Sequence, residues 1–307
     1  MKPSILSFFK KSTPIEKIFY LLTFALIIII IANYASHQTI EGFKENKNFI
    51  TKSGIDVYDN FYVSVYDDLL YSTIKNNYEI GEIINKVGPT QNSKILDIGS
   101  GTGHHVALFA DQGYDAIGID LSPAMIQKAN DNYSSLKFIQ DDALNSMIFP
   151  PNSFHLITCL YFTLYYIDNK RQFFDNCMKW LHPGGSLAIH LVDKHNFNPI
   201  VPAGDPLTLI SAQTFAKERI TSTVVDFDTH EYKANFTLDT PNKATLHETF
   251  KEKKKPNIRK NEHLLHMNSQ KEILSQAKAA GFVFTVQIDL IKCEYENQYI
   301  YILQKPN

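Results

Sequence analysis

The chain has 307 residues, of which 44% are hydrophobic, enough for a substantial core in one large or two ordinary domains. Its net charge of −2 supplies no basic surface field, so nucleic acid is not an expected partner. The three cysteines, Cys159, Cys177 and Cys293, lack C-x-x-C spacing, which argues against a disulfide framework and a zinc site, and no metal is expected.

The amino terminus contains an uncharged apolar run from Ile18 to Ala35. This run is about long enough to cross a bilayer as one helix, and Tyr20 and Tyr34 stand near its ends. A signal peptide is the competing interpretation, but its apolar region would be shorter. We therefore expect a membrane anchor within residues 1–36, followed by a polar linker over residues 37–54.

Aromatic residues become frequent directly after the linker. Between Tyr58 and Tyr71 they recur at spacings near three and four, which predicts a helix with one apolar face. A second helix is expected over Tyr78–Val87, and the Gly88-Pro89 pair ends it.

A strand, a glycine-rich turn and a helix are predicted next. The apolar stretch Lys94–Ile98 runs into glycines at alternate positions, Gly99, Gly101 and Gly103, and a helical pattern follows at once. Glycines are needed where the backbone takes positive φ or where a ligand comes close, and free N–H groups at the helix start attract anions. A dinucleotide fingerprint would carry its third glycine where His104 stands, which argues against NAD.

The following segments predict further strands of a doubly wound sheet. The second strand, Asp115–Asp120, ends in a carboxylate about twenty residues beyond the first glycine, where an acid can accept hydrogen bonds from both ribose hydroxyls. Ser122 is then expected to cap a helix that has Pro123 in its first position. The third strand is expected over Leu136–Gln140 and precedes Asp141, Asp142 and Ala143.

The fourth strand is expected over Phe154–Leu160, and the aromatic segment 161–166 follows it. Ligands of such sheets lie beyond the carboxyl ends of the strands, so this aromatic segment should face the reaction centre. A helix over Lys170–Trp180 and an L-x-P-G-G turn at 181–185 lead into a fifth strand, Ser186–Val192.

The pattern changes after Asp193, Lys194 and His195, which leave the fifth strand at its carboxyl end. Over residues 196–267, alternating segments predict antiparallel strands joined by polar turns such as 251–260. Residues 268–307 then predict a helix over Ser269–Ala280 that ends at Gly281, and two closing strands over 282–288 and 298–303.

These motifs, in this order, resemble those of class I S-adenosylmethionine (SAM) methyltransferases. The shared marks are the glycine loop preceded by Asp97, the D-L-S-x-x-M-I run at 120–126, the L-x-P-G-G turn, and A-G-F at 280–282. The resemblance implies an α/β fold with a doubly wound seven-stranded sheet. Its SAM-binding core with an amino-terminal lid is expected over residues 55–195, an inserted antiparallel β subdomain over 196–267, and the helix and closing hairpin of the core over 268–307. It also implies SAM as the cofactor.

The resemblance assigns roles residue by residue. The cofactor residues that it implies are Asp97, Gly99, Ser100, Gly101, Gly103, His104, Asp120, Leu121, Met125, Asp142, Ala143 and Leu160. Met125 is expected against the adenine, and Asp142 and Ala143 at its ring edge. The catalytic candidates are Tyr71 of the lid, Tyr166 of the aromatic segment and His195.

Three functions stay open at this level. The glycine-type and aminosugar N-methyltransferases share the V-Y-D lid at 65–67 and an inserted sheet, which favours methyl transfer to a small amine. The apolar run favours a membrane lipid or quinone as acceptor. A membrane-tethered SAM-binding scaffold without turnover is the third interpretation.

Membrane orientation is predicted in two opposite ways. Lysines 2, 10, 11 and 17 precede the apolar run and only lysines 44 and 47 follow it, which favours a cytosolic amino terminus and a translocated domain. SAM is made in the cytosol, however. We therefore expect a cytosolic catalytic domain despite the lysines.

Overall fold

The computed structural model describes residues 13–14, 16–17, 23, 49–199 and 219–307. The predicted membrane span at 18–35 therefore lies outside the described residues, apart from Thr23, and so does the stretch 200–218 of the predicted insert. Among the helices that are described, none has the length and apolar character needed to cross a membrane.

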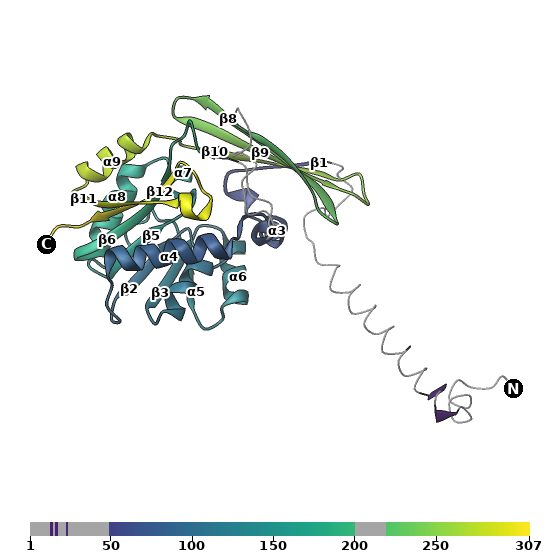
Figure 1. Cartoon of the computed structure of the whole chain (residues 1–307), viewed down its shortest axis with the longest axis horizontal. Coiled ribbons are helices and arrows are strands. Elements are labelled where there is room, and N and C mark those ends of the chain that lie inside the picture. Colours follow the sequence, from purple (N-terminus) through teal and green to yellow (C-terminus); the bar gives the residue numbers. More distant parts are fainter. Residues whose placement is uncertain (1–12, 15, 18–22, 24–48, 200–218) are drawn as a thin grey trace. The chain divides into compact units, whose positions relative to one another are not determined.

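The core is a seven-stranded sheet with the order β11-β12-β6-β5-β2-β3-β4 (Figure 1). Strands β2 to β6 run parallel, whereas β12 pairs antiparallel with both β6 and β11. The predicted doubly wound sheet is thus confirmed. The strand bounds are β2 Lys94–Ile98, β3 Asp115–Asp120, β4 Lys137–Gln140, β5 Phe154–Cys159, β6 Leu181–Val192, β11 Val283–Asp289 and β12 Gln298–Gln304.

Helices cover both faces of this sheet because its strands carry apolar residues on both faces. Ile95 of β2 packs with helices α4 and α5, and its neighbour Leu96 packs on the other face with α8 and α9. The same alternation runs through β5 and β6. The helix bounds are α4 Thr73–Val87, α5 His104–Asp111, α6 Pro123–Asn132, α7 Thr163–Tyr166, α8 Lys170–Trp180 and α9 Gln270–Ala279.

Side-chain caps begin four of these helices, α4, α6, α8 and α9, where the sequence places small polar residues. Ser122 accepts a hydrogen bond from the backbone N–H of Met125, with Pro123 next to it, as predicted. Ser269 and Glu272 form a reciprocal capping box on α9. Helix α4 starts at Thr73, five residues before its predicted start, because Ser72 caps it there.

The insert and strand β1 together form a separate five-stranded sheet with the order β1-β10-β9-β8-β7. Its bounds are β1 Phe49–Ser53, β7 Ser222–Asp226, β8 His230–Thr240, β9 Lys243–Glu252 and β10 Ile258–Leu265. Residues 49–53, which the sequence places in a linker, pair in parallel with β10. The predicted polar turn at 251–260 is also too long, because β9 and β10 extend into it and leave only 253–257 as the connection.

The aromatic lid lies against this sheet (Figure 1). A short 3₁₀ turn, η1 (Gly54–Val57), precedes helix α3 (Asn60–Leu70), so Tyr58 lies just before the helix that was predicted to include it. Phe61, Tyr62 and Leu69 of α3 are buried with Tyr232 of β8 and Phe250 of β9. This apolar contact fixes one side of the lid to the insert.

A buried ion pair fixes the start of the lid. Arg259 of β10 is fully buried and donates from Nη1 to both carboxylate oxygens of Asp59 at 2.8 Å. Asp59 is also the N-cap of α3 and accepts from the backbone N–H of Tyr62. The Arg259 Nη2 group donates to the carbonyl of Val57.

Candidate active site

The glycine loop connects β2 to α5 with a backbone that only glycine adopts easily. Gly99 has φ +72°, and a Cβ there would come within 2.4 Å of the Thr163 side chain. Gly103, with φ +93°, is the N-cap of α5, and a Cβ there would come within 2.7 Å of the Phe138 ring. The loop therefore presents bare backbone, as predicted.

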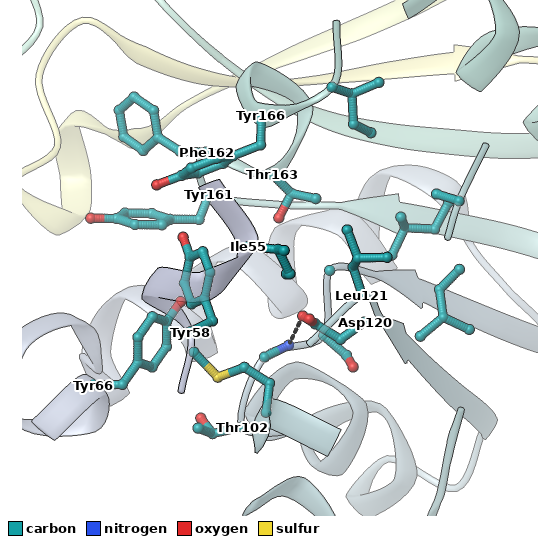
Figure 2. A pocket seen from close by; sticks show the side chains of 18 of the residues that line it. Ile55, Tyr58, Tyr66, Thr102, Asp120, Leu121, Tyr161, Phe162, Thr163 and Tyr166 are labelled. Carbon is teal, nitrogen blue, oxygen red and sulfur yellow. Dashed lines mark hydrogen bonds between the residues drawn. The ribbon is translucent and has the colours of Figure 1, made fainter. Parts of the chain in front are cut away.

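Asp120 organises this loop from the end of β3. Its Oδ2 atom accepts a hydrogen bond from the Gly101 N–H at 3.0 Å (Figure 2), and its Oδ1 atom accepts one from the Ser122 N–H at 2.9 Å. Burial raises the pKa of Asp120, although these backbone bonds oppose that shift. The carboxylate retains lone pairs for further donors such as ribose hydroxyls.

A cavity of about 490 Å³ opens beside the loop, within the size range of small-ligand sites. It brings together eleven of the residues predicted for the site: Tyr71, Gly99, Ser100, Gly101, His104, Asp120, Leu121, Met125, Asp142, Ala143 and Tyr166. These residues come from the lid, from the glycine loop and from the ends of β3, β4 and β5. The carboxyl-end location expected from the sheet topology is therefore where the cavity lies.

Four predicted residues do not line this cavity. Asp97 is buried in β2 and accepts a hydrogen bond from the Thr158 hydroxyl at 2.6 Å, and Gly103 shapes the turn. Leu160 is buried among apolar side chains of the core. His195 is exposed in the turn after β6, where its backbone N–H donates to Asp193, so the strand end does not bring it to the other candidates.

Aromatic side chains form the wall of the cavity that faces Asp120. Figure 2 shows Tyr58, Tyr66, Tyr161 and Tyr166 on one side and Asp120 with Leu121 on the other. The rings of Tyr58 and Tyr166 meet edge to face at 6.0 Å. Burial raises the pKa of all four tyrosines, so their hydroxyls are neutral at physiological pH.

Tyr161 is held in an unusual backbone conformation within this wall. Its φ of +52° lies in the left-handed region, which non-glycine residues seldom adopt. The Nδ1–H group of His190 donates a hydrogen bond to the Tyr161 carbonyl, which holds the conformation. Strained residues of this kind concentrate at binding sites.

The lid is joined to the glycine loop by Asp67 of α3. The Thr102 hydroxyl donates to Asp67 Oδ1 at 2.7 Å, and His104 Nε2 lies 3.2 Å from the same oxygen. Tyr71, the C-cap of α3, stacks on the His104 imidazole with ring centroids 4.0 Å apart. Tyr71 therefore covers the glycine-loop side of the cavity and lies apart from the aromatic wall.

A charged cluster forms the floor beside the loop. The Lys75 ammonium group lies 2.8 Å from Glu79 Oε1, and His105 Nε2 lies 3.3 Å from Glu79 Oε2. Burial alone would raise the pKa of Glu79, but Lys75 and His105 lower it to about 2. Lys75 and His105 both line the cavity; His105 was expected beside the tail of the cofactor, whereas Lys75 was not predicted from the sequence.

The cavity residues fit a nucleoside that carries an amino-acid tail. The loop offers unobstructed backbone, Asp120 offers carboxylate lone pairs to a ribose, and the methionine side chain of Met125 offers an apolar surface. Within the described part of the chain, the Ser100 hydroxyl is buried without a hydrogen-bond partner and lines the same cavity. Such an unpaired polar atom is expected where a ligand completes the site.

The fold and loop define a Rossmann-like methyltransferase domain. Residues 95–185 match the family described as "Methyltransferase domain". The fold is similar to that of SAM-bound CalS10, an amino pentose methyltransferase from Micromonospora echinaspora, with a TM-score of 0.57, 17% identity, and coverage of 80% of this chain and 96% of that chain. Residues 95–185 thus match a methyltransferase domain, and the chain has the class I SAM-dependent methyltransferase fold, which agrees with the predicted enzyme class and cofactor.

The sequence relatives align with this chain over only part of their own length. Phosphoethanolamine N-methyltransferase from Plasmodium falciparum is 33% identical over 168 residues, which are 52% of this chain and 58% of the relative. Demethylmenaquinone methyltransferase from Renibacterium salmoninarum is 23% identical over 159 residues, which are 49% of this chain and 66% of the relative. The chain therefore spans between about half and two thirds of these relatives.

Proposed function

We propose that the protein transfers the methyl group of SAM to the nitrogen of a small amine. The observation that carries this proposal is the aromatic wall formed by Tyr58, Tyr66, Tyr161 and Tyr166, opposite Asp120. Electron-rich ring faces attract ammonium groups, and an ammonium that has lost water gains most from them. Because the hydroxyls of these tyrosines are neutral, the wall attracts an ammonium group through its ring faces and carries no full negative charge.

The chemistry demands little covalent participation from the protein. When bound, SAM would supply an electrophilic methyl group, and S-adenosylhomocysteine would be the leaving group. The residues hold the nucleoside through Asp120 and the glycine loop, and the lid excludes water through its contacts with Thr102 and His104. The aromatic wall orients the amine. Phosphoethanolamine and amino sugars are acceptor types named for the relatives, and both carry an amine.

A membrane quinone or lipid is the second candidate acceptor. It is supported by the similarity to a demethylmenaquinone methyltransferase and by the uncharged run Ile18–Ala35, which we propose anchors the protein to a membrane with its catalytic domain in the cytosol. Membrane fractionation and protease protection of the full-length protein test this placement. Release of the protein by a carbonate wash would contradict the anchor.

An acceptor screen decides between the candidates. The full-length protein is incubated with SAM and with phosphoethanolamine, an amino sugar or demethylmenaquinone in detergent, and formation of S-adenosylhomocysteine is measured. The Asp120→Asn variant is the control for cofactor-dependent turnover, and Asp115→Asn at the exposed start of the same strand is its matched control. Turnover with amines alone supports the proposal, whereas turnover with the quinone alone overturns it. Binding of S-adenosylhomocysteine without turnover of any acceptor would indicate a scaffold.

A further inference from the structure

A buried carboxylate lies behind the aromatic wall. Glu248 of β9 is 1% exposed and shares its face of the strand with Leu246 and Phe250. Its Oε1 atom accepts hydrogen bonds from the hydroxyls of Tyr232 at 2.8 Å and Tyr62 at 3.1 Å. An acid in a strand face that is otherwise apolar is costly unless several donors hold it.

The other carboxylate oxygen faces β10. Glu248 Oε2 accepts from the Asn261 amide at 3.1 Å and lies 2.7 Å from Nε2 of His263. Burial alone would raise the pKa of Glu248, but His263 and these hydrogen bonds lower it. The carboxylate is therefore ionised.

An ionised Glu248 determines the tautomer of His263. Because a carboxylate only accepts hydrogen bonds, Nε2 of His263 must carry a proton, and whenever the ring is neutral Nδ1 is the acceptor. Nδ1 lies 2.9 Å from the hydroxyl oxygen of Tyr166, so that hydroxyl donates to it. The hydrogen-bonded chain thus runs from Tyr166, which lines the cavity, through His263 to Glu248.

Four titratable side chains face His263 from the elements that pack against it. The titratable groups that face it are Glu248 on β9, Tyr166 on α7, and the two lid-side residues Tyr58 and Tyr62, whose rings lie 5.9 Å and 5.6 Å from the imidazole. A second, smaller cavity of about 50 Å³ extends from Tyr58 and Tyr166 to Glu248.

We propose that Tyr166, His263 and Glu248 form a proton relay that deprotonates the acceptor ammonium before methyl transfer. This inference rests on the proposed amine N-methyltransferase function. The ammonium N–H bond breaks and its proton goes to the Tyr166 oxygen, while the Tyr166 O–H proton goes to Nδ1 of His263. The nitrogen keeps the electron pair for attack on the methyl group, and the resulting imidazolium is stabilised by the adjacent carboxylate. Tyr166 is the catalytic residue, and His263 and Glu248 are positioning residues.

The relay is tested by the pH dependence of turnover with the best amine of the acceptor screen. In His263→Gln, an amide replaces the ring, so a hydrogen bond to Glu248 is retained but no proton is accepted. We expect kcat/KM at pH 7 to fall by about a hundredfold or more, because general base catalysis typically contributes that much. The loss should shrink as the pH approaches the pKa of the free amine, since solvent then deprotonates it. Affinity for S-adenosylhomocysteine should not change.

Two further variants keep the inference falsifiable. Tyr166→Phe removes only the hydroxyl and should reproduce the altered pH profile even if His263→Gln folds poorly. His247→Gln, on the exposed face of β9 next to Glu248, should leave the profile unchanged. An unchanged profile in both relay variants, with turnover of the amine intact, overturns the relay while the amine function stands. Turnover by the wild-type protein of the quinone alone overturns the function and the relay together.

Discussion

Replacement of Asp120 by Asn tests the cofactor site most directly. The carboxylate holds the Gly101 and Ser122 N–H groups and offers its remaining lone pairs to the ribose. Asn keeps one acceptor oxygen but turns an NH₂ group toward a backbone or ribose donor. Hydrogen bonds to a charged group contribute about 1.5–3 kcal/mol. At about 1.4 kcal/mol per decade, affinity for S-adenosylhomocysteine should fall about ten- to a hundredfold.

The assay is calorimetric titration of the full-length protein with S-adenosylhomocysteine, and thermal unfolding is followed in parallel. Asp115→Asn is the control because that side chain is 61% exposed and its ion pair with Lys94 spans 4.0 Å, so its effect should be under about 0.5 kcal/mol. Asp120→Asn should also lower the unfolding temperature, since a backbone N–H in the loop loses its acceptor. Unchanged affinity of a folded Asp120→Asn protein would refute the assignment of this cavity to SAM.

Three other substitutions and one control probe the supports of the site. Gly99→Ala should abolish tight binding of S-adenosylhomocysteine, because the new Cβ would lie 2.4 Å from the Thr163 side chain. Gly81→Ala has open space around the new Cβ and should stabilise α4 by up to about 1 kcal/mol. Calorimetric titration measures the first effect and thermal unfolding the second. Burial lowers the pKa of His190 to about 4. As the pH falls from about 6.5 toward 4, this histidine is protonated in the unfolded chain but not in the folded protein, so the free energy of unfolding should fall by about 3 kcal/mol in all. Urea unfolding of His190→Gln should show a smaller loss over that window, and an equal loss would contradict this reasoning. Asp59→Ala should leave buried Arg259 unpaired and cost about 2 kcal/mol in urea unfolding, and a cost under 0.5 kcal/mol would mean that water replaces the carboxylate.

The core could be predicted because its signals are local. Each strand-turn-helix step is encoded within about twenty residues, so the glycine loop, Asp120 and the cap at Ser122 were all placed correctly in the chain. Strand β1 was not predicted because its five residues mix polar and apolar side chains without a clear alternation in hydrophobicity, and in the fold they are only exposed or half-buried. They become a strand only through pairing with β10.

The cavity could be predicted only in part, because part of it is built from distant segments. Tyr66 and Tyr166 come to share a wall through the fold, and no spacing in the sequence relates them. One signal for Glu248 was present: an acid at the position between Leu246 and Phe250 breaks an otherwise apolar face. His195 illustrates the opposite case, since a position directly after a parallel strand does not fix where the side chain points.

The ion pair between Arg259 and Asp59 also bears on how the chain folds during synthesis. These residues are 200 positions apart, and contacts of such separation form late because a long loop must close first. A nascent chain that has emerged only through β6 already contains the glycine loop and Asp120, but it lacks the strand that holds the lid in place. We therefore expect the cofactor-binding elements to be assembled on the ribosome before β10 fixes the lid in place, so that SAM can stabilise the unfinished protein by binding to it.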